Sequence, residues 1–457
     1  MKRKGLLSRR LIAVVVLLAC VGCVVDGVTW TDWDGLQVCH PSAFVQPKSE
    51  LELVQIVRSA HANNHQVKVV GSGHSFSPIT LTETPAAVLL NLDFLNGVLR
   101  IDPEASVVVV QSGIRVHVLN DRLLEAGFAL INTGAIAQQS IAGATQTGTH
   151  GTGKNIGSMS TAIVGMKILL ANGTFVNASR DENQDIFDAG RVGLGALGIV
   201  TETTLRIVPK FKLKRTATPY SLKNLLNDLP RLYEQYERLQ WYYTPYTDNA
   251  TLLLREVVPN DTPIVPCWPG SLEEFSNLVH GQNKTCTDWS FKALCHEADD
   301  ATKYTEMEYF VNVQDSEKLV DEFMEFQNSM KGSLGQQCNS KVQGPCALFT
   351  GLRYAARTEN EPWMSPMYPG AIAVLSNIVL GSATKTGPSE IFDAYAKGLE
   401  RIATKYGGRP HWGKMNWATA KDIAPVYQQL DSFKTLRKQL DPDGMFVNDY
   451  LKRILGV

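Results

Sequence analysis

A glycine loop that contains a histidine constrains the fold of this chain more than any other feature. Residues 69–77 read Val-Val-Gly-Ser-Gly-His-Ser-Phe-Ser and follow a helix with a capping box at Ser49 and a β-rich run over 66–70. Glycines directly after a strand bring backbone N–H groups close to an anion, most often a phosphate. A Rossmann turn would have a third glycine and lead into a helix, whereas Pro78 follows here. Taken alone, the loop could also be a simple turn.

Two further glycine-rich segments strengthen the case for a bound ligand. Residues 138–153 are mostly small, hydroxylated or glycine residues, which suits the wall of a site for a large flat ligand. Residues 191–200 contain three more glycines and lead directly into a strand-like run over 201–207. Three such segments, each next to a strand, predict one extended nucleotide cofactor that lies across them.

These segments resemble the vanillyl-alcohol-oxidase type of flavoprotein, specifically the sugar-1,4-lactone and alditol oxidases, such as the gulonolactone and arabinonolactone oxidases. The resemblance runs from about Trp30 to the end of the chain and implies FAD, bound covalently through His74 to the flavin 8α carbon. The two later segments match the family's other FAD-wrapping stretches. The residues expected to contact FAD are Gly71, Ser72, Gly73, His74, Ser75, Thr133, Gly134, Ser140, Gly143, Thr147, Gly148, Thr149, His150, Gly151, Gly198 and Ile199.

The reacting side is expected to contain Arg353, His411 and Lys414 as catalytic residues. Arg409-Pro-His-Trp-Gly-Lys resembles the family's substrate-side motif, and hydride transfer to a flavin needs an acceptor for the hydroxyl proton and positive charge near the flavin. Without the resemblance, Arg353 could be a surface charge and Lys414 a solvated loop residue. His150 is expected to line the site rather than to take part in the chemistry.

The sequence departs from the family at one position. The strand that reads Glu-x-Arg in relatives has Gly351 in place of the carboxylate, while Arg353 is kept. Because that carboxylate is expected to contact substrate hydroxyls in relatives, the substrate of this chain stays open. Glu308 matches a family strand and could line the same sheet.

The leading hypothesis is a secreted FAD-dependent oxidase that removes a hydride from a sugar lactone, alditol or related carbohydrate alcohol and passes the electrons to oxygen, giving hydrogen peroxide. Two alternatives stay open: a dehydrogenase of the same family with another acceptor, and a degenerate flavin-binding protein without catalysis, suggested by Gly351. A formal net charge of −1 gives no case for a nucleic-acid partner. His61 and His65 lack a third ligand, so no metal site is predicted.

The first 25 residues read as a secretory signal peptide, or as a short signal anchor. Lys2, Arg3, Lys4, Arg9 and Arg10 precede an apolar run from residue 11 to residue 25. The remaining chain has no run of about 18 apolar residues, so no other membrane segment is expected. Secretion or a location in the secretory lumen also agrees with five glycosylation sequons, at Asn172, Asn177, Asn249, Asn260 and Asn283.

The sequence predicts an α+β protein in two parts. Residues 27–210 are expected to form a two-subdomain FAD-binding domain of the vanillyl-alcohol-oxidase type, and residues 211–457 an antiparallel-sheet substrate cap whose C-terminal segment returns to the flavin. An even number of cysteines outside the leader predicts disulfides in a secreted chain, with Cys39 as the partner of one in the later group. The six are Cys39, Cys267, Cys286, Cys295, Cys338 and Cys346.

Overall fold

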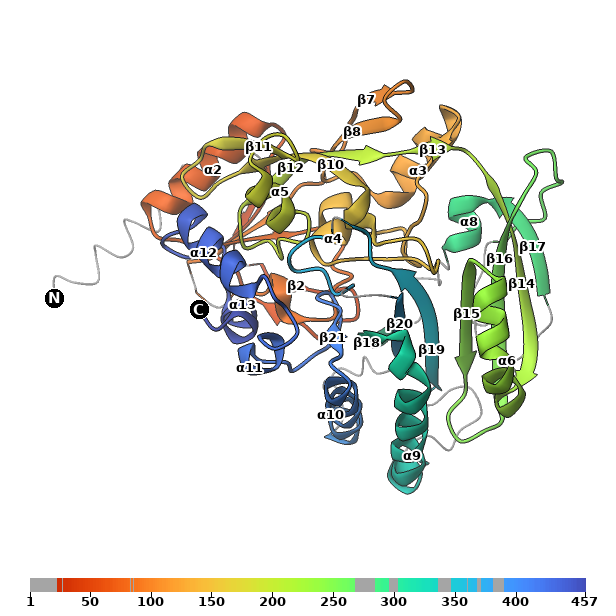
Figure 1. Ribbon diagram of the computed structural model, residues 1–457. Helices are drawn as coiled ribbons and strands as arrows, with labels where there is room; N and C mark the ends of the chain where they lie inside the picture. The colour runs from red at the N-terminus through yellow and green to blue at the C-terminus, as the bar shows by residue number, and fades with distance from the viewer. Residues whose placement is uncertain are drawn as a thin grey trace.

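The chain folds into an N-terminal half with two main sheets and two short two-stranded sheets, and a C-terminal half built on one large antiparallel sheet (Figure 1). The computed structural model describes residues 23–26, 28–82, 84, 86–267, 284–295, 303–335, 347–359, 361–367, 371–380 and 390–457. Helices pack on one face of the large sheet. The predicted α+β class with an antiparallel cap is confirmed.

The first sheet has the strand order β1-β4-β6-β5 and carries the glycine loop at one end. Strands β4 and β5 both run parallel to β6, and α2 is the crossover between β4 and β5. The Ser49 Oγ caps α2 by accepting a hydrogen bond from the Glu52 N–H (3.2 Å). The loop over 71–75 therefore leaves the carboxyl end of a parallel strand, where ligand sites form in such sheets. The elements are β1 (Cys23–Asp26), β4 (Ala43–Gln46), α2 (Glu50–Ala62), β5 (Val67–Val70) and β6 (Val88–Asn91).

The second sheet is antiparallel, with the strand order β11-β10-β12-β8-β7. The hairpin between β10 and β11 turns at Asn172-Gly173, and Gly173 has a φ of 76°. The Leu194 N–H donates to the Gln146 carbonyl (3.3 Å), which joins the second and third glycine-rich segments. The elements are β7 (Val98–Asp102), β8 (Val107–Gln111), α3 (Val116–Glu125), α4 (Ile141–Gln146), β10 (Ile163–Leu169), β11 (Phe175–Ser179), α5 (Gln184–Gly190) and β12 (Ile199–Arg206).

The cap sheet has eight strands in the order β17-β14-β16-β15-β19-β20-β18-β21, and all neighbouring pairs are antiparallel. Helices α6, α9 and α10 pack against it in one apolar cluster. The elements are β14 (Lys212–Ser221), α6 (Leu222–Gln235), β15 (Arg238–Tyr243), β16 (Asn249–Val258), β17 (Lys284–Trp289), β18 (Tyr304–Asn312), α9 (Ser316–Gly335), β19 (Ala347–Ala356), β20 (Ala371–Leu380), α10 (Glu390–Lys405) and β21 (Arg409–Pro410).

The central cap strands are buried on both faces, but the faces differ in chemistry. Successive side chains of a strand point to opposite sides. In β15, the Tyr243 hydroxyl donates to Gln327 of α9 (2.7 Å), whereas the Arg238 guanidinium donates to the Ile131 carbonyl of the N-terminal half (3.0 Å). The helix-covered face is apolar and aromatic. The other face carries charged side chains toward the N-terminal half.

The C-terminal segment returns to the first sheet (Figure 1). The Val67 N–H donates to the Met445 carbonyl (2.9 Å), and the Asn448 side-chain amide donates to the Pro78 and Leu81 carbonyls (3.0 Å each). These bonds hold both sides of the glycine loop against the end of the chain. The helices here are α11 (Ala420–Ile423), α12 (Leu430–Leu440) and α13 (Asp449–Leu455).

The cysteines only partly follow the prediction. Cys267 and Cys286 form a disulfide. The prediction that Cys39 pairs with one of the later cysteines is wrong, because Cys39 is a buried free thiol that packs between Val70 and Leu89 in a small apolar cluster. The Cys295 thiol lies 3.6 Å from the Gly134 carbonyl oxygen. Cys338 and Cys346 lie outside the described residues.

The predicted leader falls mostly outside the described residues. Its last three residues, 23–25, belong to β1, which pairs with β4. Within the described ranges, no helix is both long and apolar enough to cross a membrane.

Candidate active site

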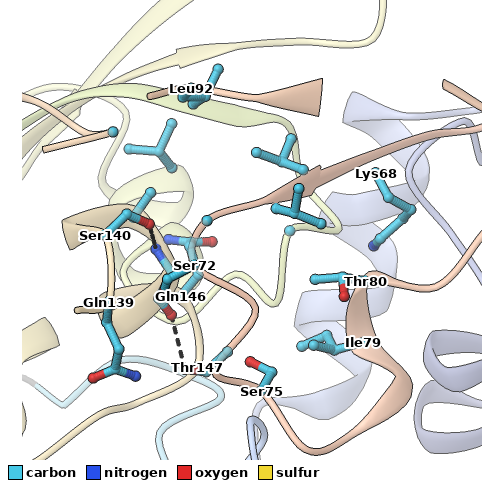
Figure 2. Close-up of a pocket in the computed structure, with 18 of the residues that line it drawn as sticks. Lys68, Ser72, Ser75, Ile79, Thr80, Leu92, Gln139, Ser140, Gln146 and Thr147 are labelled. Atoms are coloured by element: carbon cyan, nitrogen blue, oxygen red, sulfur yellow. Dashed lines mark hydrogen bonds between the residues drawn. The ribbon is translucent and has the colours of Figure 1, made fainter. Parts of the chain in front are cut away.

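A pocket in the N-terminal half brings the three glycine-rich segments together (Figure 2). Figure 2 shows Ser72 and Ser75 of the first segment and Ser140 and Thr147 of the second around this space, with Lys68 across from them. The predicted cofactor residues that line it are Gly71, Ser72, Gly73, His74, Ser75, Ser140, Gly143, Thr147, Gly198 and Ile199.

The pocket also has lining residues that the sequence reasoning missed. Lys68 belongs to β5 and lies three residues before Gly71, where the glycine loop begins. Gln139 and Gln146 lie inside the second segment. Their positions next to or within the glycine segments could have identified them. The Lys68 ammonium is held by the Phe446 carbonyl (3.0 Å). Lys68 therefore also ties the pocket to the C-terminal segment.

The main chain of the pocket fits a large flat cofactor. A Cβ at Gly71 would lie 2.6 Å from the Ser140 Oγ, so the first two segments approach too closely for a side chain there. Leu194 and Gly195 are both left-handed, with φ values of 57° and 62°. A Cβ at Gly195 would find its nearest neighbour, the Lys68 Nζ, only at 4.0 Å, so this backbone faces open space. A left-handed leucine is strained, and such strain is common at ligand sites. The parts of the wall formed by the glycine-rich segments are thus largely bare backbone and small hydroxyls, which suits a large flat cofactor.

Six predicted cofactor residues do not line this pocket. Thr133, Gly134, Gly148, Thr149, His150 and Gly151 lie in a layer of close packing toward the cap. A Cβ at Gly134 would lie 2.6 Å from Thr149, one at Gly151 would lie 2.0 Å from the Asn132 Oδ1, and one at Gly148 would lie 2.9 Å from Pro366. Close loop packing accounts for these glycines. His150 reaches across this layer to the cap sheet.

The motif Arg-Pro-His-Trp-Gly-Lys, residues 409–414, bridges the pocket and the cap sheet. On the cap side, the His411 N–H donates to the Glu308 carbonyl (3.0 Å), which extends the edge of β18. On the pocket side, the Phe76 N–H donates to the Gly413 carbonyl (2.8 Å). A Cβ at Gly413 would lie 3.2 Å from the Ser75 Oγ, so the motif touches the glycine loop directly. The predicted reacting side therefore lies beside the pocket.

A buried ion pair forms the centre of this region. The His150 Nε2 lies 2.5 Å from the Glu308 Oε1, and both side chains are almost fully buried. The His150 Nδ1 lies 2.8 Å from the Gly151 carbonyl oxygen. Both ring nitrogens of His150 are therefore engaged, one with the Glu308 carboxylate and one with a backbone carbonyl. Burial alone would raise the pKa of Glu308, but His150, Arg353 and His411 outweigh it and hold that pKa well below its usual range.

Arg353 places a second cation next to Glu308. It lies on β19, opposite Gln240 of β15, and is 8% exposed. Burial opposes its charge, but Glu308, Tyr242 and Glu306 raise its pKa above the usual value, so it is charged. Among the described residues, the Arg353 Nε has no hydrogen-bond acceptor. A buried N–H donor without an acceptor lowers the free energy of unfolding, unless a bound ligand accepts its hydrogen bond.

His411 is a neutral hydrogen-bond donor in this arrangement. Its Nδ1 accepts a hydrogen bond from the Gly413 N–H (3.0 Å), which places the ring proton on Nε2. Burial is the main cause that lowers its pKa to about 3, with Glu308 opposing and Lys414 adding to the shift. The ring is therefore neutral near pH 7 and can donate a hydrogen bond from Nε2.

Lys414 is paired rather than free. Its ammonium contacts the Glu306 carboxylate and lies 4.9 Å from the centroid of the Phe76 ring. Glu306 lies two residues before Glu308 on β18, on the same face. The structure thus brings all three predicted catalytic residues to one place, together with two carboxylates and the imidazole of His150. Of these carboxylates, the sequence reasoning noted Glu308 as a candidate and missed the role of Glu306.

The place of the absent family carboxylate is filled by a tyrosine. A Cβ at Gly351 would lie 2.6 Å from the Tyr242 Cδ1 and 2.7 Å from its Cε1, because Tyr242 is the direct cross-strand partner of Gly351. The Tyr242 hydroxyl accepts from the Gln240 amide, which holds the ring in this position. An aromatic ring over a strand glycine is a known stabilising pair.

Restoring a carboxylate at Gly351 is therefore expected to disturb the cap. Gly351→Glu, and also Gly351→Ala, should lower the free energy of unfolding by about 1–3 kcal/mol, because the added atoms force the Tyr242 ring out of a packed site. Urea unfolding monitored by tryptophan fluorescence would measure this. Gly351→Glu/Tyr242→Ala should recover part of the loss. A Gly351→Glu protein as stable as the parent would show that the ring moves freely.

A buried acid next to the glycine loop predicts a pH dependence of stability. Burial, and next the charge of Asp34, raise the pKa of Asp32 to about 8. The folded protein then holds a proton that the unfolded chain releases above about pH 4, so unfolding free energy falls between about pH 4 and pH 8. Asp32→Asn should remove this slope and raise stability at pH 8 by about 2 kcal/mol. Melting curves from pH 5 to pH 9 would test it, and parallel curves for both proteins would contradict it.

Comparison with known proteins agrees with this geometry. The family model described as FAD binding domain matches residues 41–179, and the model described as D-arabinono-1,4-lactone oxidase matches residues 262–454. L-gulono-1,4-lactone dehydrogenase of Mycobacterium tuberculosis (strain CDC 1551 / Oshkosh) is 29% identical, over 93% of this chain and 99% of the relative. L-gulonolactone oxidase of Mus musculus is 28% identical, over 94% of this chain and 98% of the relative.

Solved structures share the fold. A solvent-stable cholesterol oxidase has a TM-score of 0.78 at 18% identity, with 96% of this chain and 99% of that chain covered. Xylooligosaccharide oxidase from Myceliophthora thermophila C1, in complex with xylobiose, has a TM-score of 0.72 at 16% identity, with 95% and 98% covered. The chain is therefore a flavoprotein of the vanillyl-alcohol-oxidase type, with an FAD-binding domain and an antiparallel cap.

Within this class, the chain belongs to the aldonolactone oxidase family of gulonolactone and arabinonolactone oxidases and dehydrogenases. It is an FAD-dependent oxidoreductase that acts on CH–OH donors. The family and the class of enzyme predicted from the sequence are confirmed. The alternative of a flavin-binding protein without catalysis is thereby set aside.

Proposed function

We propose that this protein is a secreted oxidase that removes a hydride from a sugar lactone, alditol or related carbohydrate alcohol, with dioxygen as the acceptor and hydrogen peroxide as a product. The buried charge cluster of Glu308, His150 and Arg353 beside the pocket carries this proposal. Bound FAD would supply the hydride acceptor, and the lining glycines, Ser75 and Thr147 would hold it. A cluster whose charges offset one another is suited to a neutral, hydroxyl-rich substrate.

Each side chain of this cluster has its own role in the proposed reaction. An alcohol that loses a hydride also loses its hydroxyl proton, so a hydrogen-bond acceptor must face that hydroxyl. Glu308 is ionised and serves as this acceptor, while the His150 ring holds the carboxylate in place through its Oε1. The Arg353 guanidinium donates to a substrate oxygen, and His411 donates from Nε2. The Lys414 ammonium adds positive charge on the pocket side, where negative charge develops.

One experiment can identify both the substrate and the electron acceptor. The names of the relatives include both oxidases and a dehydrogenase, so a dehydrogenase of the same family is the second candidate. Purified protein would be given a panel of lactones, alditols and sugars, and hydrogen peroxide would be measured in air beside the reduction of a dye without air. Peroxide at a rate near that of dye reduction supports the oxidase. Dye reduction without peroxide supports the dehydrogenase.

Secretion is supported by exposed sequons. Asn172, Asn177, Asn249 and Asn260 are all exposed, and Asn172 lies in a hairpin turn that can carry a glycan. Expression of the full chain in a eukaryotic secretory host should yield medium protein that loses mass on treatment with an N-glycosidase. Protein that stays inside the cell with an intact N-terminus and no glycan would contradict this part of the proposal.

Covalent attachment of FAD at His74 predicts a simple spectroscopic difference. His74 lines the pocket in the first glycine loop, between Gly73 and Ser75. After acid precipitation, flavin fluorescence should stay with the parent protein and leave it in His74→Ala. The variant should still bind FAD, because the backbone walls are unchanged. Flavin that is freely extracted from the parent would contradict covalent attachment.

A further inference from the structure

An indole ring lies directly against the histidine proposed to carry the flavin. The ring centroids of Trp33 and His74 are 4.8 Å apart, with an angle of 29° between the planes, so the rings are stacked. The ring centroids of Trp33 and Tyr304 are 5.0 Å apart, in an edge-to-face arrangement. A stack of this kind limits how far the imidazole can rotate about its side-chain bonds.

The main chain of Trp33 holds the same loop. The Trp33 N–H donates to the Gly73 carbonyl (2.8 Å), immediately before His74. Gly73 is left-handed, with a φ of 75°, and a Cβ there would lie 3.2 Å from the Trp33 nitrogen. The Gln37 side-chain amide donates to the Phe76 carbonyl (3.2 Å) on the other side of the histidine. The segment that carries Trp33 therefore forms hydrogen bonds with the loop on both sides of His74.

Two buried acids fix this segment to the cap. Asp32 Oδ1 accepts from the Gly35 and Gln37 N–H groups (3.0 Å each), which closes a tight turn around Trp33. Asp34 accepts from the Thr305 hydroxyl of β18, three residues before Glu308. Asp32 and Asp34 are 5% and 1% exposed. Trp33 is thus held between the cofactor loop and the strand that carries the reacting carboxylates.

We propose that Trp33 is a positioning residue that fixes the His74 imidazole for covalent attachment of FAD. The inference rests on the covalent linkage proposed above. Attachment replaces one hydrogen of the flavin 8α methyl group and the imidazole N–H hydrogen with a C–N bond, and two electrons and two protons pass to dioxygen, which becomes hydrogen peroxide. The nitrogen must face that carbon at close range, so a freely rotating ring reacts more slowly.

The alternative is that Trp33 is only part of the core, and the chain offers a matched control for it. Trp417 is also partly buried against the same apolar cluster and also has a lysine over its ring, with Lys397 at 5.2 Å where Trp33 has Lys303 at 4.3 Å. It is not stacked on His74. Trp417→Leu therefore reports the effect of losing a comparable indole from this core without losing the stack.

The test follows covalent attachment with time. Full-length Trp33→Leu, Trp33→Phe, Trp417→Leu and parent proteins would be produced under limiting riboflavin and incubated with FAD in air. Acid-precipitable flavin per protein would be measured. Attachment in Trp33→Leu should be about three- to tenfold slower than in the parent, while Trp33→Phe and Trp417→Leu stay within about twofold. Total FAD binding should be similar in all four.

Attachment in Trp33→Leu at the parent's rate would overturn the inference, and equal slowing in Trp417→Leu would reduce it to a core effect. A parent whose flavin is wholly extractable would instead overturn the covalent linkage itself. If Trp33→Leu does not fold, Thr305→Val removes the bond to Asp34 and leaves the indole in place. It should slow attachment several-fold, and parent-like attachment would overturn the inference.

Discussion

Glu308→Gln is expected to slow substrate-driven flavin reduction by about a thousandfold and to lower the free energy of unfolding by about 3–5 kcal/mol. The change removes the ionised acceptor for the substrate hydroxyl. It also removes the buried carboxylate that pairs with His150 and offsets the charge of Arg353. Both effects come from one side chain, because Glu308 is at once the proposed hydrogen-bond acceptor for the substrate and the counter-charge of the buried groups around it. Stopped-flow reduction and urea unfolding would measure them separately.

The two effects of Glu308→Gln can be told apart with a double-mutant cycle. His150→Gln and the double variant should show a coupling free energy well above zero, because each single change breaks the same pair. The pH dependence gives a second check. The pKa of Glu308 is lowered in the folded protein, so its stabilisation is present above the unfolded value near pH 4.5 and is lost as the pH falls further. A variant with parent-like stability at pH 7 and pH 4 would contradict the ion pair.

Much of the cofactor site could be predicted because its information is local. Each glycine-rich segment lies next to a strand, and the loop over 71–75 follows a parallel strand whose carboxyl end must face a ligand site. The resemblance also placed His411 and Lys414 near that site. The glycines of the second segment were harder to assign, since a glycine that admits a ligand and one that admits another loop, such as Gly151, look alike in sequence.

The charge pairing could not be predicted, because it depends on the order of strands in the cap. Glu308 and His150 are far apart in sequence and meet only because β18 lies near the edge of the sheet beside the second glycine-rich segment. The Tyr242 ring fills the space at Gly351 only because of the register between β15 and β19. One signal was available: Glu306 and Glu308 alternate with apolar residues in a strand that is buried throughout, and buried carboxylates need partners.

Arg353→Met is expected to slow flavin reduction about a hundredfold while FAD stays bound. The guanidinium lies on the cap face and contributes nothing to the walls of the pocket, so cofactor retention should not depend on it. Its loss removes a preorganised cation beside the reacting carboxylates, which typically costs about 3 kcal/mol of transition-state stabilisation. Lys414→Met should give a similar loss, although it also leaves Glu306 without its ion-pair partner.

Arg238→Met is the matched control for Arg353→Met. Arg238 is an equally buried arginine on the neighbouring strand β15, and it points to the same side of the sheet, where it donates to the Ile131 carbonyl. Its removal should cost stability, but flavin reduction should change by less than about threefold, because Glu308 is not among the groups that shift its pKa. Stopped-flow reduction with the best substrate would compare the two. Equal rates for Arg353→Met and the parent would remove Arg353 from the reacting site and leave Glu308 and His150 to act without a substrate-facing guanidinium.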